Sequence, residues 1–335
     1  MIIDIHGHVS APNGLYAYKA NLLAARGSHG RGGARFTDEQ VEQALNAKSV
    51  FGDGHLDQLK KHGTDLQLLS PRPFQMMHSE RPAKIVQWLH EEFHNLIAQQ
   101  VKLHPSTFRG VAGLAQVAGL PVEVALPELE RCITELGFVG TLINPDPYEN
   151  SGVEPPAMGD RYWYPLYEKL CELDVPAMIH TAGSRAERTP YSLHFVNEET
   201  IAILGLVNSD VFKDFPDLKI VVPHGGGSVP YQFGRFQAGT ASRPRGERFL
   251  DRLRHLYFDC TLYTPEAVEL LIKVVGADRV MFGTECPGTG SFMNPELGYA
   301  FDHVKPSVDQ IAWLTDADRK LIFEDTARRV FRLDL

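Results

Sequence analysis

Short apolar runs alternate along most of the chain with longer segments in which apolar residues recur at i, i+3 and i+4. Runs of the first kind are typical of buried strands and segments of the second kind of amphipathic helices, so the alternation indicates βα units. It predicts strands near Ile2–His6, Leu66–Ser70, Phe108–Leu114, Val139–Ile143, Val175–His180, Lys219–His224, Leu256–Cys260 and Val280–Gly283. Helices are predicted at Ile85–Leu103, Val122–Leu136, Trp163–Leu173, Glu198–Phe212, Pro265–Val275 and Asp316–Phe323.

Strands and helices in this order favour an α/β fold, a single (β/α)8 TIM-type barrel that takes up residues 1–335. Three segments, 9–55, 144–162 and 284–310, are too long for plain βα loops. We therefore expect them to be insertions over the C-terminal face of the barrel. Loops in such places usually shape the binding pocket.

Composition and charge exclude several kinds of partner. A formal net charge of −9 and a pI near 5.9 argue against nucleic acid, which needs a basic surface. No apolar run approaches the roughly 18 residues that span a bilayer, and no signal peptide precedes the first strand, so we expect a cytoplasmic protein without a membrane partner. The four cysteines have no metal-ligand spacing and make no disulfide framework. Cys286, beside Glu285, is expected to line the site.

Several predicted strands end in a histidine or lead into a glutamate. His6 and His8 stand two residues apart at the end of the first strand, so their side chains point to the same side and can reach one ion. His180 and His224 end the fifth and sixth strands, and Glu285 follows the eighth. The C-terminal ends of barrel strands converge on one face, where metal and substrate bind. The sequence therefore predicts a metal centre on this face.

Each of these residues has a predicted role and a competing one. His6, His8 and His180 are predicted metal ligands, although His180 alone also fits a hydrogen-bonded core histidine. Neutral imidazole suits Zn²⁺, with Mn²⁺ or Fe²⁺ as alternatives, and three nitrogens leave room for a carboxylate and a water. Glu285 fits a ligand, a proton acceptor or both in turn, and a surface glutamate is its competing interpretation. His224, followed by three glycines that allow close approach, fits a general acid/base or an oxyanion stabiliser.

Polar side chains near other strand ends are candidates for substrate contacts. Ser70 and Arg72 follow the second strand, and Arg235 follows the sixth. A guanidinium group binds a carboxylate through two hydrogen bonds, although a structural ion pair suits either arginine equally well. Asn144 ends the fourth strand, where it fits a donor to substrate or a turn former.

Two more side chains are expected near the site because of their place in the chain. His194 lies in the segment Arg185–Asn197, which follows the fifth strand and is predicted to contact substrate. Asp4, two residues before His6, points with the ligands only if the first strand is regular, and fits a hydrogen-bond partner behind them.

The chain resembles the decarboxylase and hydratase branch of the amidohydrolase superfamily. The resemblance runs nearly end to end, through Asp4–His8, Glu130–Phe138, Asp174–His180, Phe212–Pro216, Pro223–Gly227 and Thr326–Phe331. Many decarboxylases of this branch carry aspartate after the eighth strand, where this chain has Glu285. Glutamate there, together with Ser70-Pro71-Arg72 and Asn144-Pro145-Asp146-Pro147, is similar to the 4-oxalomesaconate hydratases of bacterial lignin and gallate catabolism.

The resemblance implies zinc on His6, His8, His180 and Glu285, with His224 assisting. It implies a small anionic carboxylate as substrate, an oligomer of identical chains, and addition of water to an unsaturated oxo-tricarboxylic acid such as 4-oxalomesaconate. Residues 9–55 and 185–197 match the branch less well, which leaves the substrate open.

Three alternatives remain at this point. The first is a metal-dependent, non-oxidative decarboxylase of an aromatic or muconate-type acid, in which His224 protonates the carbanionic carbon. The second is a lactone or amide hydrolase. The third is a barrel without catalysis that serves as a binding module, which a metal-free protein with an undisturbed fold would favour.

Overall fold

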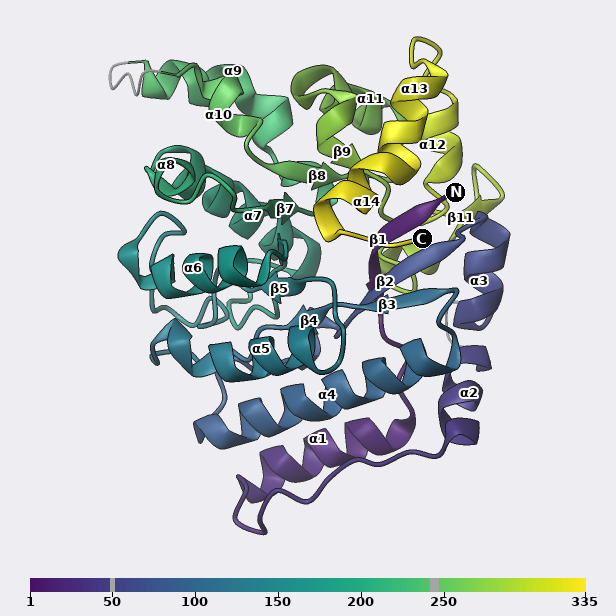
Figure 1. Ribbon diagram of the computed structural model, residues 1–335, viewed down its shortest axis with the longest axis vertical. Helices are drawn as coiled ribbons and strands as arrows, with labels where there is room; N and C mark the ends of the chain where they lie inside the picture. The colour runs from purple at the N-terminus through teal and green to yellow at the C-terminus, as the bar shows by residue number, and fades with distance from the viewer. Residues whose placement is uncertain (49–51, 242–246) are drawn as a thin grey trace.

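The computed structural model describes residues 1–48, 52–241 and 247–335, and its central strands run parallel to one another (Figure 1). One sheet has the order β1-β2-β3 and a second the order β4-β5-β6-β7-β8-β9. Their bounds are β1 Ile3–His8, β2 Leu66–Ser70, β3 Phe108–Gly110, β4 Ala112–Gly113, β5 Thr141–Ile143, β6 Ala177–Ile179, β7 Ile220–Val222, β8 Tyr257–Asp259 and β9 Val280–Met281.

Backbone hydrogen bonds join the two sheets into a closed barrel. Only Val111 separates β3 from β4, and its N–H donates to the carbonyl of Leu69 at 2.8 Å, so β3 and β4 are two parts of one strand. On the other side, the N–H of Ile5 donates to the carbonyl of Phe282 at 3.0 Å, and the N–H of Glu285 to that of His6 at 2.7 Å. The strands β1 to β9 thus fill eight positions, which confirms the predicted (β/α)8 barrel and all eight predicted strands, with bounds shifted by a few residues.

Helices surround these strands (Figure 1). Their bounds are α1 Asn13–Ala25, α2 Asp38–Asn46, α3 His55–His62, α4 Ala83–Leu103, α5 Leu126–Thr134, α6 Tyr164–Leu173, α7 Tyr191–Val207, α8 Val211–Asp214, α9 Val229–Thr240, α10 Phe249–Leu253, α11 Pro265–Val275, α12 Lys305–Asp309, α13 Asp316–Lys320 and α14 Thr326–Phe331. The helix predicted at Pro265–Val275 has these bounds, but the one predicted at Glu198–Phe212 begins seven residues earlier, at Tyr191, and is interrupted after Val207. Pro190 precedes its first residue, where a fixed φ suits a helix start.

The interior of the barrel is apolar at one end and polar at the other. Its apolar core takes buried side chains from every strand position except that of β8, whose half-buried Tyr257 packs against it. The core also includes residues of the C-terminal segment, and its buried members are Ile3, Ile5, Leu66, Leu68, Val111, Leu142, Met178, Val221, Met281, Ala327, Val330, Phe331 and Leu333. Helix α14 therefore covers the end at which the strands begin, close to both chain termini in Figure 1. The histidines lie at the opposite end of the barrel, where the strands end.

A bulge in β1 allows its inward-facing side chains to change from apolar residues to histidines along the strand. Ile3 pairs with Leu66, but His8 pairs with Ser70, so β1 has one more residue than β2 over this stretch. The extra residue shifts the inward-facing positions from Ile3 and Ile5 to His6 and His8. Gly7 lies in the bulge, where a Cβ atom would come within 2.2 Å of the Gln67 side chain.

The long segments predicted as insertions contain structure of their own. Residues 9–55 hold α1, α2 and the first residue of α3, and positions 49–51 of this range lie outside the described residues. Helix α1 was not predicted because only Leu15 and Leu22 are buried along it, too few to give a helical stripe. Residues 284–310 hold α12 and the antiparallel strands β10 (Met293–Asn294) and β11 (Tyr299–Ala300). None of the described helices is both long and apolar enough to cross a membrane.

His55, the first residue of α3, is buried between the N-terminal segment and the barrel. Its Nε2 lies 2.7 Å from Oε1 of Gln67, and its Nδ1 lies 3.1 Å from Oγ of Ser10. Burial lowers the pKa of His55 from 6.5 to about 4.

This shift makes the stability of the fold depend on pH. Between pH 6.5 and about 4, the unfolded chain binds a proton on His55 that the folded chain does not, so the free energy of unfolding falls as the pH falls. The contribution is fully present above pH 6.5 and amounts to about 3 kcal/mol at most. Urea unfolding at pH 7 and pH 5 should show a shallower pH dependence for His55→Gln than for the parent or for His29→Gln, at an exposed position. Equal slopes in the three proteins would contradict this.

Candidate metal centre

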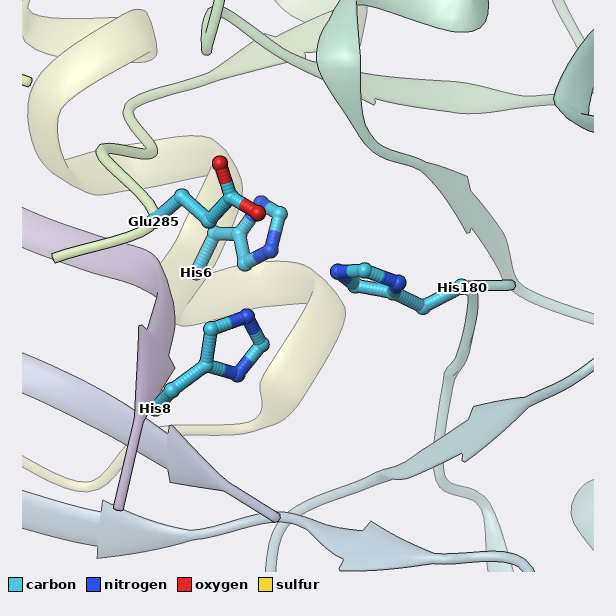
Figure 2. A group of neighbouring side chains, drawn as sticks. All are labelled: His6, His8, His180 and Glu285. Carbon is cyan, nitrogen blue, oxygen red and sulfur yellow. The ribbon is translucent and has the colours of Figure 1, made fainter. Parts of the chain in front are cut away.

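Four side chains from distant parts of the chain meet at the C-terminal end of the barrel (Figure 2). His6 and His8 come from β1, His180 follows β6, and Glu285 lies four residues beyond β9. One potential ligand atom from each lies within 4.8 Å of the others. All four residues are at least 95% buried, with 1%, 3%, 2% and 5% exposure in the order given. The side chains that the sequence predicted as metal ligands are therefore brought together.

The hydrogen bonds of the three imidazoles leave the same ring nitrogen free in each. Nδ1 of His6 lies 2.7 Å from a carboxylate oxygen of Asp259, and Nδ1 of His180 lies 3.0 Å from the carbonyl of Thr181, so both must donate. Nδ1 of His8 lies 3.0 Å from Oγ of Ser70, whose own hydrogen goes to the carbonyl of Gly7. Each ring thus carries its hydrogen on Nδ1 and a lone pair on Nε2. Nε2 of both His6 and His180 is buried without a hydrogen-bond partner among the described residues.

These features fit a bound cation. Buried polar atoms are rarely left without a partner, and metal-binding histidines commonly donate their second N–H to a carboxylate or carbonyl. Burial lowers the pKa of His8 and of His180 well below the usual value, so both rings are neutral, as ligands must be. Burial alone would raise the pKa of Glu285, but the hydrogen bond and charge of His224 hold it well below its usual range. The set therefore offers three imidazole nitrogens and one carboxylate.

Asp259, the last residue of β8, received no role from the sequence although its strand was predicted. It is fully buried, and its two oxygens accept hydrogen bonds from His6 and from the N–H and hydroxyl of Thr261. Burial opposes its charge, yet the hydrogen bond from His6 keeps the pKa of Asp259 below its usual value. The rule that polar residues at strand ends face the site would also have found this one.

His224 lies beside the four residues and has a carboxylate on each side. Its Nδ1 is 2.6 Å from Oε1 of Glu199, and its Nε2 is 3.6 Å from Oε1 of Glu285. Burial would lower the pKa of His224, but these two carboxylates raise it well above the usual value and so favour the protonated ring. Glu199 lies on α7 and is fully buried. Sequence reasoning missed it because a glutamate in a helix carries no sign of the strand end that it faces.

Three residues around the centre have left-handed backbone conformations. The φ angles are +49° at His224, +60° at Tyr263 and +65° at Glu285. Such conformations cost about 1 to 3 kcal/mol in residues other than glycine and tend to occur at functional sites. The hydroxyl of Tyr263 donates to Oε2 of Glu285 at 2.9 Å, so it fixes the orientation of that carboxylate.

Tyr263→Phe should therefore weaken metal binding. Loss of the hydrogen bond frees the Glu285 side chain, and partners of metal ligands typically contribute about 10-fold to 100-fold in affinity. Titration of the metal-free protein with Zn²⁺ in a competing chelator measures this directly. The matched control is Tyr257→Phe, because Tyr257 packs against Arg279 instead of the centre. An unchanged affinity for Zn²⁺ in Tyr263→Phe would show that the hydroxyl does not support the ligand.

The predicted substrate contacts that follow β2 and β5 have different surroundings. Ser70 holds His8, as described above, and is only 4% exposed. Asn144 forms the turn that was its alternative role, since its Oδ1 accepts from the N–H of Asp146, while its buried Nδ2 has no partner among the described residues. Arg72 is half-buried near His8, and the proximity of its charge helps to keep the His8 ring neutral.

The other predicted residues lie at varying distances from the centre. His194, on α7, is buried, hydrogen-bonds to the backbone of Gly183 and has an unpartnered Nε2 among the described atoms. Arg235 is exposed on α9, and in the described structure no hydrogen bond or ion pair joins it to the centre. Cys286 is buried with its thiol 3.0 Å from Oε1 of Gln58, so it faces away from the four ligands.

Asp4 does not point with the ligands, because the bulge makes β1 irregular. It is fully buried and accepts hydrogen bonds from Gln67 and from the N–H and hydroxyl of Thr284. Burial raises the pKa of Asp4 to about 6, which its hydrogen bonds only partly offset. Its contact with Thr284 holds the residue next to Glu285, in keeping with a place behind the ligands.

The glycines after His224 allow neighbouring side chains of the protein to pack closely against the backbone. A Cβ atom on Gly225 would lie 2.6 Å from the Leu262 side chain, and one on Gly226 would lie 2.7 Å from Phe258. The close approach seen here is that of neighbouring elements of the protein.

A second group of potential ligands consists of His94, Glu128 and Cys132. His94 donates from Nδ1 to Glu128 at 2.6 Å and accepts at Nε2 from the N–H of Gly113 at 2.9 Å. Arg131 donates to both oxygens of Glu128. Because these atoms already satisfy one another, the group is a hydrogen-bond network that joins α4 to α5.

Comparison with known proteins adds to this geometry. A family model described as amidohydrolase matches residues 3–333. The 2-keto-4-carboxy-3-hexenedioate hydratase of Sphingobium sp. is 36% identical over 342 residues, which cover 100% of this chain and 97% of that protein. A solved 4-oxalomesaconate hydratase from Rhodopseudomonas palustris has a TM-score of 0.86 and 32% identity, covering 99% of this chain and 96% of its own. A dihydroxybenzoic acid decarboxylase from Polaromonas sp., solved with manganese and 2-nitroresorcinol, shares the fold with a TM-score of 0.71 and 24% identity, covering 99% of this chain and 97% of its own.

Proposed function

The chain belongs to the amidohydrolase family, and from this premise we propose that it is a metal-dependent hydratase, a carbon–oxygen lyase. Its substrate is an unsaturated oxo-tricarboxylic acid such as 4-oxalomesaconate, as in bacterial catabolism of aromatic compounds. One observation carries the proposal: three imidazoles with free Nε2 atoms meet Glu285 in a chain that is similar to hydratases over nearly its whole length. The substrate class follows from the activities of those relatives.

We assign the metal to His6, His8, His180 and Glu285. Three imidazoles and a carboxylate suit Zn²⁺, and the same set accommodates Mn²⁺ or Fe²⁺. When bound, such an ion is a Lewis acid that lowers the pKa of water and polarises oxygen atoms of the substrate. Asp259, Ser70 and the Thr181 carbonyl keep the three rings turned toward it.

The remaining residues manage protons and orient the substrate. In 2-keto-4-carboxy-3-hexenedioate the double bond between C3 and C4 is conjugated to the keto group, so water adds at C4 and a proton is added at C3. Glu285 is placed to accept the proton that water loses, and protonated His224 is placed to donate one to C3. Arg72 binds a carboxylate and brings the double bond to the centre.

A decarboxylase of an aromatic or muconate-type acid is the second candidate. It is favoured by His224, because a protonated imidazole at this point can also protonate the carbon that loses carbon dioxide. The same ligand set would serve that reaction.

The test compares products. Metal-loaded protein is mixed with 4-oxalomesaconate, and the loss of its conjugated ultraviolet absorbance is followed while released carbon dioxide is assayed. Loss of absorbance without carbon dioxide, abolished by a chelator, supports the hydratase. Stoichiometric carbon dioxide would favour the decarboxylase, and an unchanged spectrum would exclude this substrate.

A further inference from the structure

A cleft of about 620 Å³ lies between the N-terminal segment, which carries α1 and α2, and the mouth of the barrel. One of its walls is formed by α1 and α2, whose places are labelled in Figure 1, and another by Arg72 and Pro287. The volume suits a small molecule, since ligand pockets commonly measure about 300 to 1,000 Å³.

The cleft carries an excess of positive charge. Arg35, Lys48 and Arg72 line it, and the only carboxylate among its lining residues is that of Asp53. Asp53 is already paired with Lys61, which lies outside the lining. Across the described chain, no hydrogen bond or ion pair engages the guanidinium group of Arg35 or of Arg72. Two free guanidinium forks in one cleft point to an anionic ligand with carboxylate groups.

Short connections link this cleft to the centre. Arg72 stands two residues after Ser70, which holds His8, and Pro287 stands two residues after Glu285. The opposite wall includes Ser10, two residues after His8. The cleft therefore begins where the ligand-bearing strands end.

Hydrogen bonds behind the cleft fix the position of its wall relative to the four proposed metal ligands. Gln67 donates from Nε2 to Asp4 and to the carbonyl of Cys286, so its Oε1 accepts from Nε2 of His55. Nδ1 of the neutral His55 ring then accepts from the hydroxyl of Ser10. This continuous chain of hydrogen bonds joins the cleft to the segment that carries Glu285.

We propose that the cleft is a carboxylate-binding subsite that selects substrates with several carboxylates, an inference that rests on the proposed function. Arg72, at the junction with the centre, binds the carboxylate nearest the double bond. Arg35 binds a carboxylate at the far end of the substrate, assisted by the amides of Gln40 and Gln43, which also line the cleft. Monocarboxylic acids leave Arg35 unused and bind weakly.

The experiment measures binding and turnover of Arg35→Gln. Propane-1,2,3-tricarboxylate and butyrate are titrated calorimetrically into the metal-loaded parent, into Arg35→Gln and into Arg161→Gln, a matched change at a side chain that is 79% exposed beside Asp214. We expect Arg35→Gln to weaken binding of the tricarboxylate about 10-fold to 100-fold, to leave butyrate within about 2-fold, and to raise KM much more than it lowers kcat. Arg161→Gln should match the parent.

The outcomes separate this inference from the proposed function. If Arg35→Gln binds the tricarboxylate as the parent does, if both ligands weaken equally, or if the parent binds no tricarboxylate, the subsite is overturned even when 4-oxalomesaconate is hydrated. If the tricarboxylate binds and weakens as expected but no hydration occurs, the subsite stands and the proposed reaction falls. Unchanged thermal unfolding of Arg35→Gln checks that the fold is intact.

Discussion

Replacing Glu285 by glutamine is expected to abolish turnover while leaving the fold intact, with kcat/KM reduced about 1,000-fold or more. The carboxylate is the one anionic member of the four-residue set and lies 3.6 Å from His224. Glutamine has nearly the same shape, and its amide oxygen can still accept the hydrogen bond from Tyr263. It is a poor metal ligand and does not accept a proton, so both proposed roles are lost together.

Three measurements on Glu285→Gln separate these roles from a loss of structure. Metal content should fall, turnover should disappear, and the thermal unfolding midpoint of the metal-free protein should stay within a few degrees of the parent. Glu266→Gln, an exposed position at the start of α11, is the matched control and should behave as the parent. Near-normal activity of Glu285→Gln would remove the residue from both the ligand and the base role.

His224→Gln is expected to reduce kcat about 100-fold to 10,000-fold, which is the usual range for loss of a general acid. Its Nε2 faces Glu285 but is not part of the ligand set, so metal content should remain at the parent level. Retained metal with lost turnover distinguishes this variant from Glu285→Gln. Loss of metal in His224→Gln would instead make His224 part of the binding site for the ion.

Glu199→Gln tests how His224 is kept protonated. The Glu199 carboxylate helps to raise the pKa of His224, and removing its charge lowers that pKa. Since the acid form of His224 is required, activity is lost as the pH rises through its pKa. The alkaline limb of the pH profile should therefore move to lower pH in Glu199→Gln. A profile that keeps its position while activity falls would point to a purely structural role.

The sequence was sufficient for the strand order and for the residues that meet at the strand ends. Buried parallel strands leave clear apolar runs, and a barrel brings their C-terminal ends together, so His6, His8, His180, His224 and Glu285 were expected to be neighbours. The residues that hydrogen-bond to these side chains were harder to predict from the sequence. Asp259 follows the same rule and was overlooked.

Other features depend on tertiary contacts that leave no local pattern. The β1 bulge arises from its register against β2, while the apolar alternation of a regular strand would place Asp4 with the ligands. Tyr263 and Glu199 reach the centre through a left-handed turn and a helix face, respectively. Arg235 was proposed from its position after the sixth strand, but α9 carries it to an exposed position.

The most direct test of the central claim is an NMR analysis of the product formed from 2-keto-4-carboxy-3-hexenedioate by the zinc-loaded protein. The account predicts that C4 changes from an alkene carbon to a hydroxyl-bearing carbon, that C3 gains a hydrogen, and that all three carboxylates remain. Removal of zinc with dipicolinate should stop the reaction, and added Zn²⁺ should restore it. A product with only two carboxylates, an unchanged alkene, or full turnover without metal would contradict the account.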